Sequence, residues 1–398
     1  MTIDRPYVSP RMGVLFDVIG PFVTWASRPD VRGASGPGIA NFMFGNPHDM
    51  APQAYVDALI RGSTPTSADH FAYKMNEEDA TAVVAASLAE RFLLPFDRED
   101  VFLTNGNFSG LSICLHAVTG PGDEVVYVSP PWFFYETLIL ESGATPVRVS
   151  ADQESWDLDL DAIAAAIGPR TAAIIVNSPN NPTGRIYPRE TLDALARILT
   201  EAGERNGRPI YLLSDEAYNR IVYDGREYPT PVASYPWSFY LYTYGKTHLA
   251  PGLRFGYIAV PPTMPGREDL RGPLLLAQVA RGWAFPVAPL QHAIGDLDRI
   301  GIDLDRLQRR RDLLVPALRE QGYDVVEPDG TFYVIVRSPI PDDQAFFDVL
   351  VGHDVYVLPG SVFEMPGWFR LSVTANDEMC ETTSTVRCWK GPMATAAS

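Results

Sequence analysis

The stretch YTYGKTHLAPGLRFGY, residues 242–257, decides the fold that we expect for this chain. An apolar run at 238–242 leads into it and a second run at 254–260 leads out of it, so we expect two buried strands with Lys246 on the turn between them. An amine held in such a place loses hydration, which favours its neutral form and makes it a nucleophile toward carbonyls. A lone lysine is more often a surface residue, so the chemical interpretation depends on the rest of the chain.

Buried apolar strands alternate with amphipathic helices through the middle of the chain. Strands are expected at 101–103, 125–128, 172–176, 210–213 and 239–242. Helices are expected at 77–94, 107–118, 158–167 and 189–202. This alternation is typical of an α/β fold with a mainly parallel central sheet flanked by helices. Ligands of such sheets bind beyond the carboxyl ends of the strands, which selects the residues directly after each strand as site candidates.

These strand ends carry groups that complement one another. The sequence TNGNFSG at 104–110 opens a predicted helix, where free N–H groups suit a phosphate, and PPWFFY at 130–135 is able to cover a flat ring. Asn181, Asp215 and Lys246 follow the remaining strands. Each has an ordinary explanation alone, as a cap, core aromatic, turn or surface acid. Together they suit pyridoxal 5'-phosphate (PLP), whose aldehyde requires a lysine and whose pyridine nitrogen requires an acid.

The chain resembles a known family, the class I and II aminotransferases, which are fold type I PLP-dependent enzymes of the aspartate aminotransferase kind. The resemblance runs from about residue 39 to residue 376. It depends on three motifs in this order: NPTG at 181–184, DEAY at 215–218, and Lys246 followed by Arg254 and Gly256.

The resemblance implies a role for each matching residue. Lys246 would form the Schiff base with PLP and transfer protons, Asp215 would pair with the pyridine nitrogen, and Tyr218 would hydrogen-bond the ring hydroxyl. Trp132 would stack on the ring, and Arg370 would bind the substrate α-carboxylate as a bidentate fork, unless it is a salt-bridged strand arginine. The other implied contacts are Asn181 to the ring hydroxyl and the substrate, Gly106, Asn107, Phe108, Thr243 and Arg254 at the phosphate turn, and Tyr73 at the phosphate of a neighbouring subunit.

The expected architecture has two domains. A large PLP-binding domain would span 51–296, and a small domain would join an irregular N-terminal arm, 1–50, to an α+β unit at 297–398. In that unit we expect a helix at 304–321 and strands at 331–336 and around Arg370, with a cleft that closes when Arg370 meets a carboxylate. The role of Tyr73 would imply a homodimer with shared sites, although an ordinary core or surface tyrosine is the alternative.

Composition excludes several classes of function. The net charge of -17 repels nucleic acid and anionic membranes, and no apolar run approaches the length of a membrane helix. The three cysteines are too scattered for a zinc site or a disulfide framework, and the first residues lack the blocks of a signal peptide, so a cytoplasmic enzyme is expected. The glycine-rich GASGPG at 33–38 lacks the flanking strand and helix of a dinucleotide-binding motif.

Departures from the family pattern leave the substrate and the reaction open. Gly245 replaces a usual serine, the segment 73–79 is unusual, Arg281 is only a weak candidate for binding a second carboxylate, and 379–398 lacks the apolar period of a closing helix. The prediction is an aminotransferase for an aromatic or apolar amino acid. The alternative is a PLP-dependent lyase, γ-replacement or cyclising enzyme of specialised metabolism, with S-adenosylmethionine as a candidate substrate. Aromatic residues that would line the site, or else belong to the core, are Trp132, Phe133, Phe134, Trp283 and Phe285.

Overall fold

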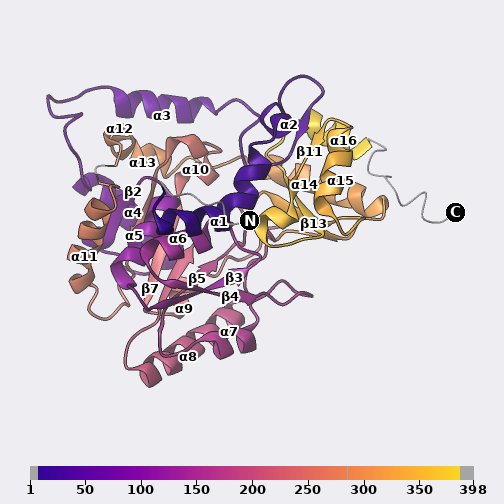
Figure 1. The fold of residues 1–398 in the computed structure, drawn as a ribbon. Helices are drawn as coiled ribbons and strands as arrows, with labels where there is room; N and C mark the ends of the chain where they lie inside the picture. The colour runs from indigo at the N-terminus through magenta and orange to yellow at the C-terminus, as the bar shows by residue number, and fades with distance from the viewer. Residues whose placement is uncertain (1–7, 285, 386–398) are drawn as a thin grey trace.

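The computed structural model describes residues 8–284 and 286–385, and a seven-stranded sheet lies at its centre (Figure 1). The strands are β2 (Val101–Thr104), β3 (Glu124–Ser129), β4 (Thr145–Ser150), β5 (Thr171–Asn177), β6 (Tyr211–Asp215), β7 (Ser238–Thr243) and β8 (Gly256–Ala259). Their order is β2-β8-β7-β6-β5-β3-β4, and β8 runs antiparallel to both of its neighbours while the other pairs are parallel. The prediction of a mainly parallel α/β sheet is confirmed.

Helices cover both faces of this sheet because its strands are apolar on both faces. Along β3, Val125 and Tyr127 pack into one core cluster while Val126 and Val128 pack into another. The helices of the first cluster are α5 (Asn107–Val118), α6 (Tyr135–Ser142) and α11 (Glu268–Ala280). Those on the opposite face are α3 (Gln53–Ser63), α4 (Glu78–Phe92), α7 (Leu160–Ala166), α8 (Arg189–Asn206), α9 (Pro231–Ser234), α12 (Ala288–His292) and α13 (Ile294–Leu297).

The C-terminal part of the chain forms a smaller α+β unit at one end of the main sheet (Figure 1). Its sheet has the order β12-β13-β10-β9, with β9 (Val325–Val326), β10 (Tyr333–Arg337), β12 (Leu358–Pro359) and β13 (Trp368–Ser372). Its helices are α14 (Leu304–Glu320), α15 (Asp343–Val351) and α16 (Asp377–Thr385). From the N-terminal arm, β1 (Ala40–Asn41) pairs with β11 (Val355–Tyr356). The domain boundaries at 50/51 and 296/297 remain a prediction.

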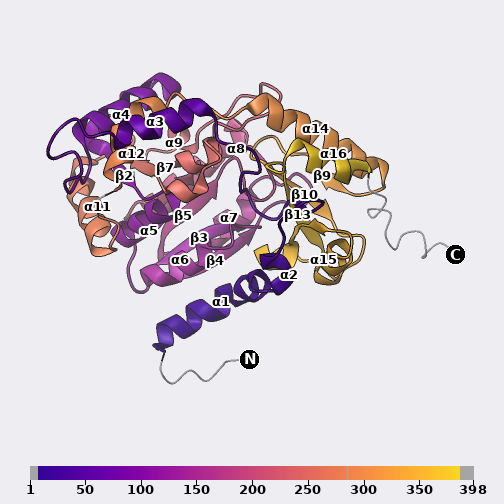
Figure 2. The ribbon, with the colours of Figure 1, turned by 90° about the horizontal axis from the view of Figure 1, so that it is seen from above.

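The N-terminal arm is more regular than the sequence suggested, so the expectation of an irregular segment was wrong. It contains α1 (Pro10–Ala26), which lies beside α6 (Figure 2), and α2 (Pro29–Arg32). Ser9 caps α1 by accepting a hydrogen bond from the Met12 N–H, and Pro10 occupies the first turn, where its missing N–H costs nothing. Trp25 is buried on the inner side of the helix. This packing outweighs the low helix propensity of the glycines and the internal proline.

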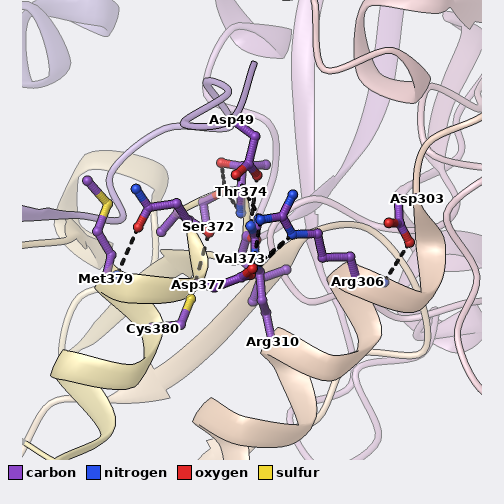
Figure 3. A network of polar contacts seen from close by, with 12 residues as sticks. Asp49, Asp303, Arg306, Arg310, Ser372, Val373, Thr374, Asp377, Met379 and Cys380 are labelled. Carbon is purple, nitrogen blue, oxygen red and sulfur yellow. Dashed lines mark hydrogen bonds and ion pairs between the residues drawn. The ribbon is translucent and has the colours of Figure 1, made fainter. Parts of the chain in front are cut away.

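The helix α16 was also not expected, and an ion-pair network holds its first residue (Figure 3). Asp377 accepts hydrogen bonds from Arg306 and Arg310 of α14, at 2.7 and 2.6 Å. Arg310 is buried and also pairs with Asp49 of the arm at 2.7 Å. Residues 386–398 of the predicted tail lie outside the described part. Within the described part, no helix is long and apolar enough to cross a membrane.

Candidate active site

A cavity of about 320 Å³ lies at the carboxyl ends of the central strands. The residues that line it follow different strands, as the sheet topology predicts, because parallel strands end at the same edge. Nine of the lining residues were selected from the sequence: Asn107, Phe108, Trp132, Asn181, Asp215, Tyr218, Thr243, Lys246 and Arg254.

Lys246 lies in α10 (Tyr244–Thr247), a single helical turn directly after β7. Thr243 caps this turn by accepting a hydrogen bond from the Gly245 N–H at 3.4 Å. The Nζ atom lies 5.5 Å from the ring centroid of Tyr218 and 5.7 Å from that of Phe332. No carboxylate within the described ranges forms an ion pair with it. The amine therefore lies between aromatic rings at the cavity.

Asp215 is the last residue of β6 and its carboxylate is buried. One oxygen accepts a hydrogen bond from the Asn107 side-chain amide at 2.5 Å, and the other accepts one from the Tyr135 hydroxyl at 2.6 Å. Burial raises the pKa of Asp215 above its ordinary value, against the effect of these donors and of Lys246. Tyr135 was not predicted as a site residue, although it ends the aromatic cluster that follows β3.

The Asn107 side chain contacts the buried acid. It donates to Asp215, because Asn107 is the first residue of α5 and its side chain reaches toward the end of β6, whereas the predicted contact of Asn107 with a phosphate stays a prediction. Its Oδ1 atom is buried without a hydrogen-bond partner among the described residues. The backbone N–H of Asn107 stays at the helix start, where it has no partner within the helix.

A cluster suited to an anion lies beside this helix start. Gly106 has φ +83°, and a Cβ added to it would lie 3.0 Å from Arg254 Nη2 and 3.6 Å from Thr243 Oγ1. Arg254 donates to the Pro251 carbonyl at 2.8 Å. Among the residues that the structure describes, it forms no ion pair with a carboxylate. Burial lowers the pKa of Arg254, which an anion would reverse. The cluster fits a phosphate dianion.

The Gly245 departure has a local explanation. A Cβ at this position would lie 3.1 Å from the Pro251 Cα and 3.4 Å from the Ala250 carbonyl oxygen. A serine would therefore crowd backbone atoms that cannot move as a side chain can. The anion cluster consists instead of Arg254, Thr243 and the start of α5.

Arg370 of β13 is buried and brings the smaller sheet to the site. It donates to the Asn181 side-chain oxygen at 2.8 Å and to the Met43 carbonyl at 3.2 Å. Its Nε has no hydrogen-bond partner, and it forms no ion pair, within residues 8–284 and 286–385. The alternative of a salt-bridged strand arginine therefore finds no support. Arg370 lies behind Asn181, which lines the cavity.

Tyr218 lines the cavity, and its hydroxyl is hydrogen-bonded to the hydroxyl of Tyr333. Burial raises the pKa of Tyr218 well above its ordinary value. Phe332 and Tyr333 were not predicted as site residues. The signal that would have found them is their position, because they follow Gly330 at the start of the strand that is predicted at 331–336 in the small unit.

The aromatic candidates divide into two groups. Trp132 and Phe108 line the cavity, with ring centroids 5.1 Å apart in an edge-to-face arrangement. Phe133 stacks at 4.4 Å on Phe22 of α1 instead, and Phe134 contacts both Phe22 and Phe108. Trp283 packs against the core beside α11, and Phe285 lies outside the described residues.

Two further candidates lie away from the cavity in this chain. Arg281 forms an ion pair with Glu141 and a hydrogen bond of 3.3 Å with Ser112, so its charge is already compensated. Tyr73 has 87% of its surface exposed, in the loop between α3 and α4. A contribution of Tyr73 to a neighbouring subunit remains a prediction.

Comparison with known proteins agrees with this geometry. A family model for class I and II aminotransferases matches residues 38–384. An aspartate/prephenate aminotransferase of Thermus thermophilus is 32% identical over 305 residues, which cover 73% of this chain and 76% of the relative. An alanine aminotransferase of Mycobacterium bovis is 28% identical over 378 residues, covering 89% of this chain and 84% of the relative. The crystal structure of an aminotransferase from Eubacterium rectale has a TM-score of 0.84 at 29% identity, covering 97% of this chain and 95% of that one.

Proposed function

The chain belongs to the class I and II aminotransferases, which depend on PLP, and from this premise we propose that its amino-acid substrate carries an aromatic or other largely apolar side chain. The observation that supports this is the wall of the cavity, where Phe108, Leu111 and Trp132 lie together. The cations that line the cavity, in the part of the chain described, are Lys246 and Arg254. Lys246 is required for the cofactor and Arg254 lies in the anion cluster, so a second substrate carboxylate would find no free guanidinium on this wall.

The residues of the cavity fit PLP, and each has a proposed task. When bound, PLP supplies an aldehyde that an amine can hold covalently and a ring that withdraws electrons from the substrate Cα. Arg254, Thr243 and the start of α5 at Gly106 would hold its phosphate, and Asp215 would hold the proton of its ring nitrogen. Asn107 and Tyr135 would keep Asp215 in place by the hydrogen bonds that they donate to it.

The remaining residues would act on the ring and the substrate. Tyr218 and Asn181 would hydrogen-bond the ring hydroxyl, Trp132 would cover the ring, and Lys246 would carry the proton between substrate atoms. Arg370 would bind the α-carboxylate, because a buried guanidinium without an acid is incompletely compensated until an anion arrives.

We also propose a homodimer in the cytoplasm. Apolar side chains are exposed on α3, on the loop after it and on α11, where Ile60 is 59%, Phe71 59%, Leu276 68% and Val279 51% exposed. Covering such side chains with a second copy would remove apolar surface from water. Tyr73 belongs to the same region, which is consistent with a task in a neighbouring subunit.

The experiment that tests the substrate proposal compares kcat/KM for phenylalanine, tryptophan and leucine with that for aspartate, glutamate and alanine. We expect a preference of about tenfold or more for the large apolar side chains, since their burial against the aromatic wall contributes roughly 1.5–3 kcal/mol. Preference for aspartate would contradict the proposal.

A second measurement distinguishes transfer from the lyase alternative. Mass spectrometry of a single turnover should find a keto acid that keeps the side chain, together with pyridoxamine phosphate. A product that has lost a side-chain leaving group, with PLP unchanged, would contradict an aminotransferase. Lys246→Ala should abolish turnover, and its retention would contradict the assignment of the lysine.

A further inference from the structure

Tyr333 links three parts of the site without lining the cavity. It begins β10, is buried, and its ring centroid lies 3.8 Å from the guanidinium carbon of Arg370. Its hydroxyl is hydrogen-bonded to the hydroxyl of Tyr218 and to the N–H of Gly45. Tyr218 follows the central strand β6, Gly45 belongs to the N-terminal arm, and Arg370 belongs to the smaller sheet. One side chain therefore contacts a cavity residue, the arm and the carboxylate-binding arginine.

The backbone around Tyr333 keeps its side chain in this place. Its N–H donates to Thr331 Oγ1 at 3.0 Å, and it pairs with Ser372 in the register of β10 and β13. At Gly45, an added Cβ would lie 2.2 Å from the Phe332 ring and 2.9 Å from the Tyr333 hydroxyl. Any side chain at position 45 would separate the arm from Tyr333, so glycine is required for this close approach.

The charges that face Tyr333 are cationic. Burial alone would raise the pKa of its hydroxyl, but Lys246, Arg370 and the hydrogen bonds from Tyr218 and Gly45 lower the pKa below its ordinary value. Beside burial and Tyr333, the negative charge of Asp215 contributes to the raised pKa of Tyr218. In the protein without a ligand, the Tyr218 hydroxyl donates a hydrogen bond to the Tyr333 oxygen. When Tyr218 donates instead to a ligand, Tyr333 can reverse its role and donate to Tyr218, which still holds the oxygen.

We propose that Tyr333 is a positioning residue of the active site, whose hydroxyl fixes Tyr218 against the ring oxygen of the cofactor and whose ring carries Arg370 in the orientation that binds the substrate carboxylate. The proposal rests on the proposed function, because it requires Tyr218 to face the cofactor and Arg370 to bind the substrate. It assigns Tyr333 itself no contact with cofactor or substrate. The hydroxyl and the ring of Tyr333 therefore have separate tasks, and different substitutions remove each of them.

Tyr223 provides a matched control. It is buried, and the guanidinium carbon of Arg311 lies 4.6 Å from its ring centroid, so it has the same kind of ring–arginine contact. Its hydroxyl has no hydrogen-bond partner among the residues that the structure describes. Arg311 pairs with Asp224 and not with a site residue. A change at Tyr223 therefore tests the general effect of altering a buried tyrosine beside an arginine.

The first measurement is the pH midpoint of the absorbance change of bound PLP. Tyr333→Phe should raise this midpoint by about half a pH unit or more, which corresponds to one hydrogen bond. The reason is that a less firmly held Tyr218 donates less to the ring oxygen, which then becomes more basic and retains the neighbouring proton. Tyr223→Phe should leave the midpoint where it is. An unmoved midpoint in Tyr333→Phe, or an equal shift in Tyr223→Phe, overturns the task of the hydroxyl.

The second measurement is the affinity for 3-phenylpropionate, a carboxylate that cannot undergo transfer. Tyr333→Phe keeps the ring and should bind it as the parent protein does, whereas Tyr333→Leu should bind it about tenfold more weakly, because the contact with a desolvated arginine is lost. Tyr223→Leu should bind normally. Equal affinity in Tyr333→Leu and Tyr333→Phe overturns the task of the ring.

A third measurement needs no cofactor. Ultraviolet difference absorbance of tyrosinate in the cofactor-free protein should show one tyrosine ionising before the others, absent in Tyr333→Phe and present in Tyr223→Phe. Its presence in Tyr333→Phe would contradict the assignment. Failure of the proposed function would look different, because the parent protein itself would then lack the PLP absorbance or prefer aspartate, whatever the variants do.

Discussion

Asn107 donates a hydrogen bond of 2.5 Å to the buried carboxylate of Asp215, although 108 residues separate the two along the chain. Tyr135 donates to the other oxygen of the same carboxylate at 2.6 Å. A buried carboxylate with a donor on each oxygen is held in one orientation before any ligand arrives. The acid of this site is therefore positioned by the two helices that follow β2 and β3.

Asn107→Ala should destabilise the cofactor-free protein by about 1–3 kcal/mol, because it removes a donor from a buried acid. Urea unfolding at neutral pH measures this free energy. The same substitution in an Asp215→Asn background should cost less, since the neutral amide needs the donor less than the carboxylate does. Equal costs in the two backgrounds would mean that Asn107 stabilises the protein in some other way than through Asp215.

Gly106→Ala should weaken PLP binding at least about tenfold, because its φ of +83° strains any other residue and the added Cβ would lie 3.0 Å from Arg254 Nη2. Titration of the cofactor-free protein with PLP measures the affinity. Gly122→Ala is the matched control, since Gly122 has φ +92° and, among the described atoms, none lies within 4 Å of the added Cβ. Both variants should lose stability, and only Gly106→Ala should lose PLP affinity. Comparable loss of PLP affinity in the two would refute an anion cluster at Gly106.

The sequence predicted those parts of the site that depend on local patterns. Lys246, Asp215 and Asn181 each follow an apolar strand, and the ends of parallel strands meet at one edge whatever the details of packing. The direction of a side chain beyond the strand end is not local. The Asn107 side chain points to Asp215, a contact that depends on how α5 lies over β6 and not on the residues near position 107.

The unpredicted elements have the same explanation. Tyr135 and Tyr333 acquire their tasks from partners 80 or more residues away, or from the other sheet. The helix α1 contains Gly13, Gly20 and Pro21, which weaken a helix in isolation. Its stability comes from burial of Trp25 and from stacking of Phe22 on Phe133, which a periodicity search within residues 1–50 does not reveal.

Glu216→Gln should stabilise the protein increasingly as the pH rises. Glu216 is completely buried, and its oxygens accept hydrogen bonds from Thr230 at 2.6 Å, Ser214 and Tyr228 at 2.8 Å and Asn219 at 3.4 Å. Burial raises its pKa from 4.5 to about 7 in spite of these donors. Between these two values the folded state binds more protons than the unfolded state, so stability falls as the pH rises. The glutamine variant lacks this loss, which amounts to roughly 3 kcal/mol above pH 7.

Urea unfolding of the cofactor-free variant and parent at pH 5 and pH 8 tests this. The difference in unfolding free energy between the two proteins should move in favour of the variant on going to pH 8. The exposed Glu204→Gln is the control and should show no such movement. A pH-independent difference for Glu216→Gln would mean that the carboxyl titrates alike in the folded and unfolded states.

Asp377→Asn should loosen α16 at neutral pH and have less effect in acid. The hydrogen bond and charge of Arg306, followed by those of Arg310, lower the pKa of Asp377 from 3.8 to about 2 (Figure 3). A group with a lowered folded-state pKa contributes stability that is complete above pH 3.8 and is lost as the pH falls toward 2. Because the Asp377 side chain is 49% exposed, solvent screening limits the contribution to about 1 kcal/mol or less.

Hydrogen exchange of the α16 amides should therefore quicken several-fold in the variant at pH 7, and the variant and the parent should converge between pH 4 and pH 2. The control is Asp324→Asn, which breaks the exposed pair with Arg337 and should leave the α16 amides unchanged. Unchanged α16 exchange in Asp377→Asn at pH 7 would show that packing against α14, and not the arginine pair, retains this helix.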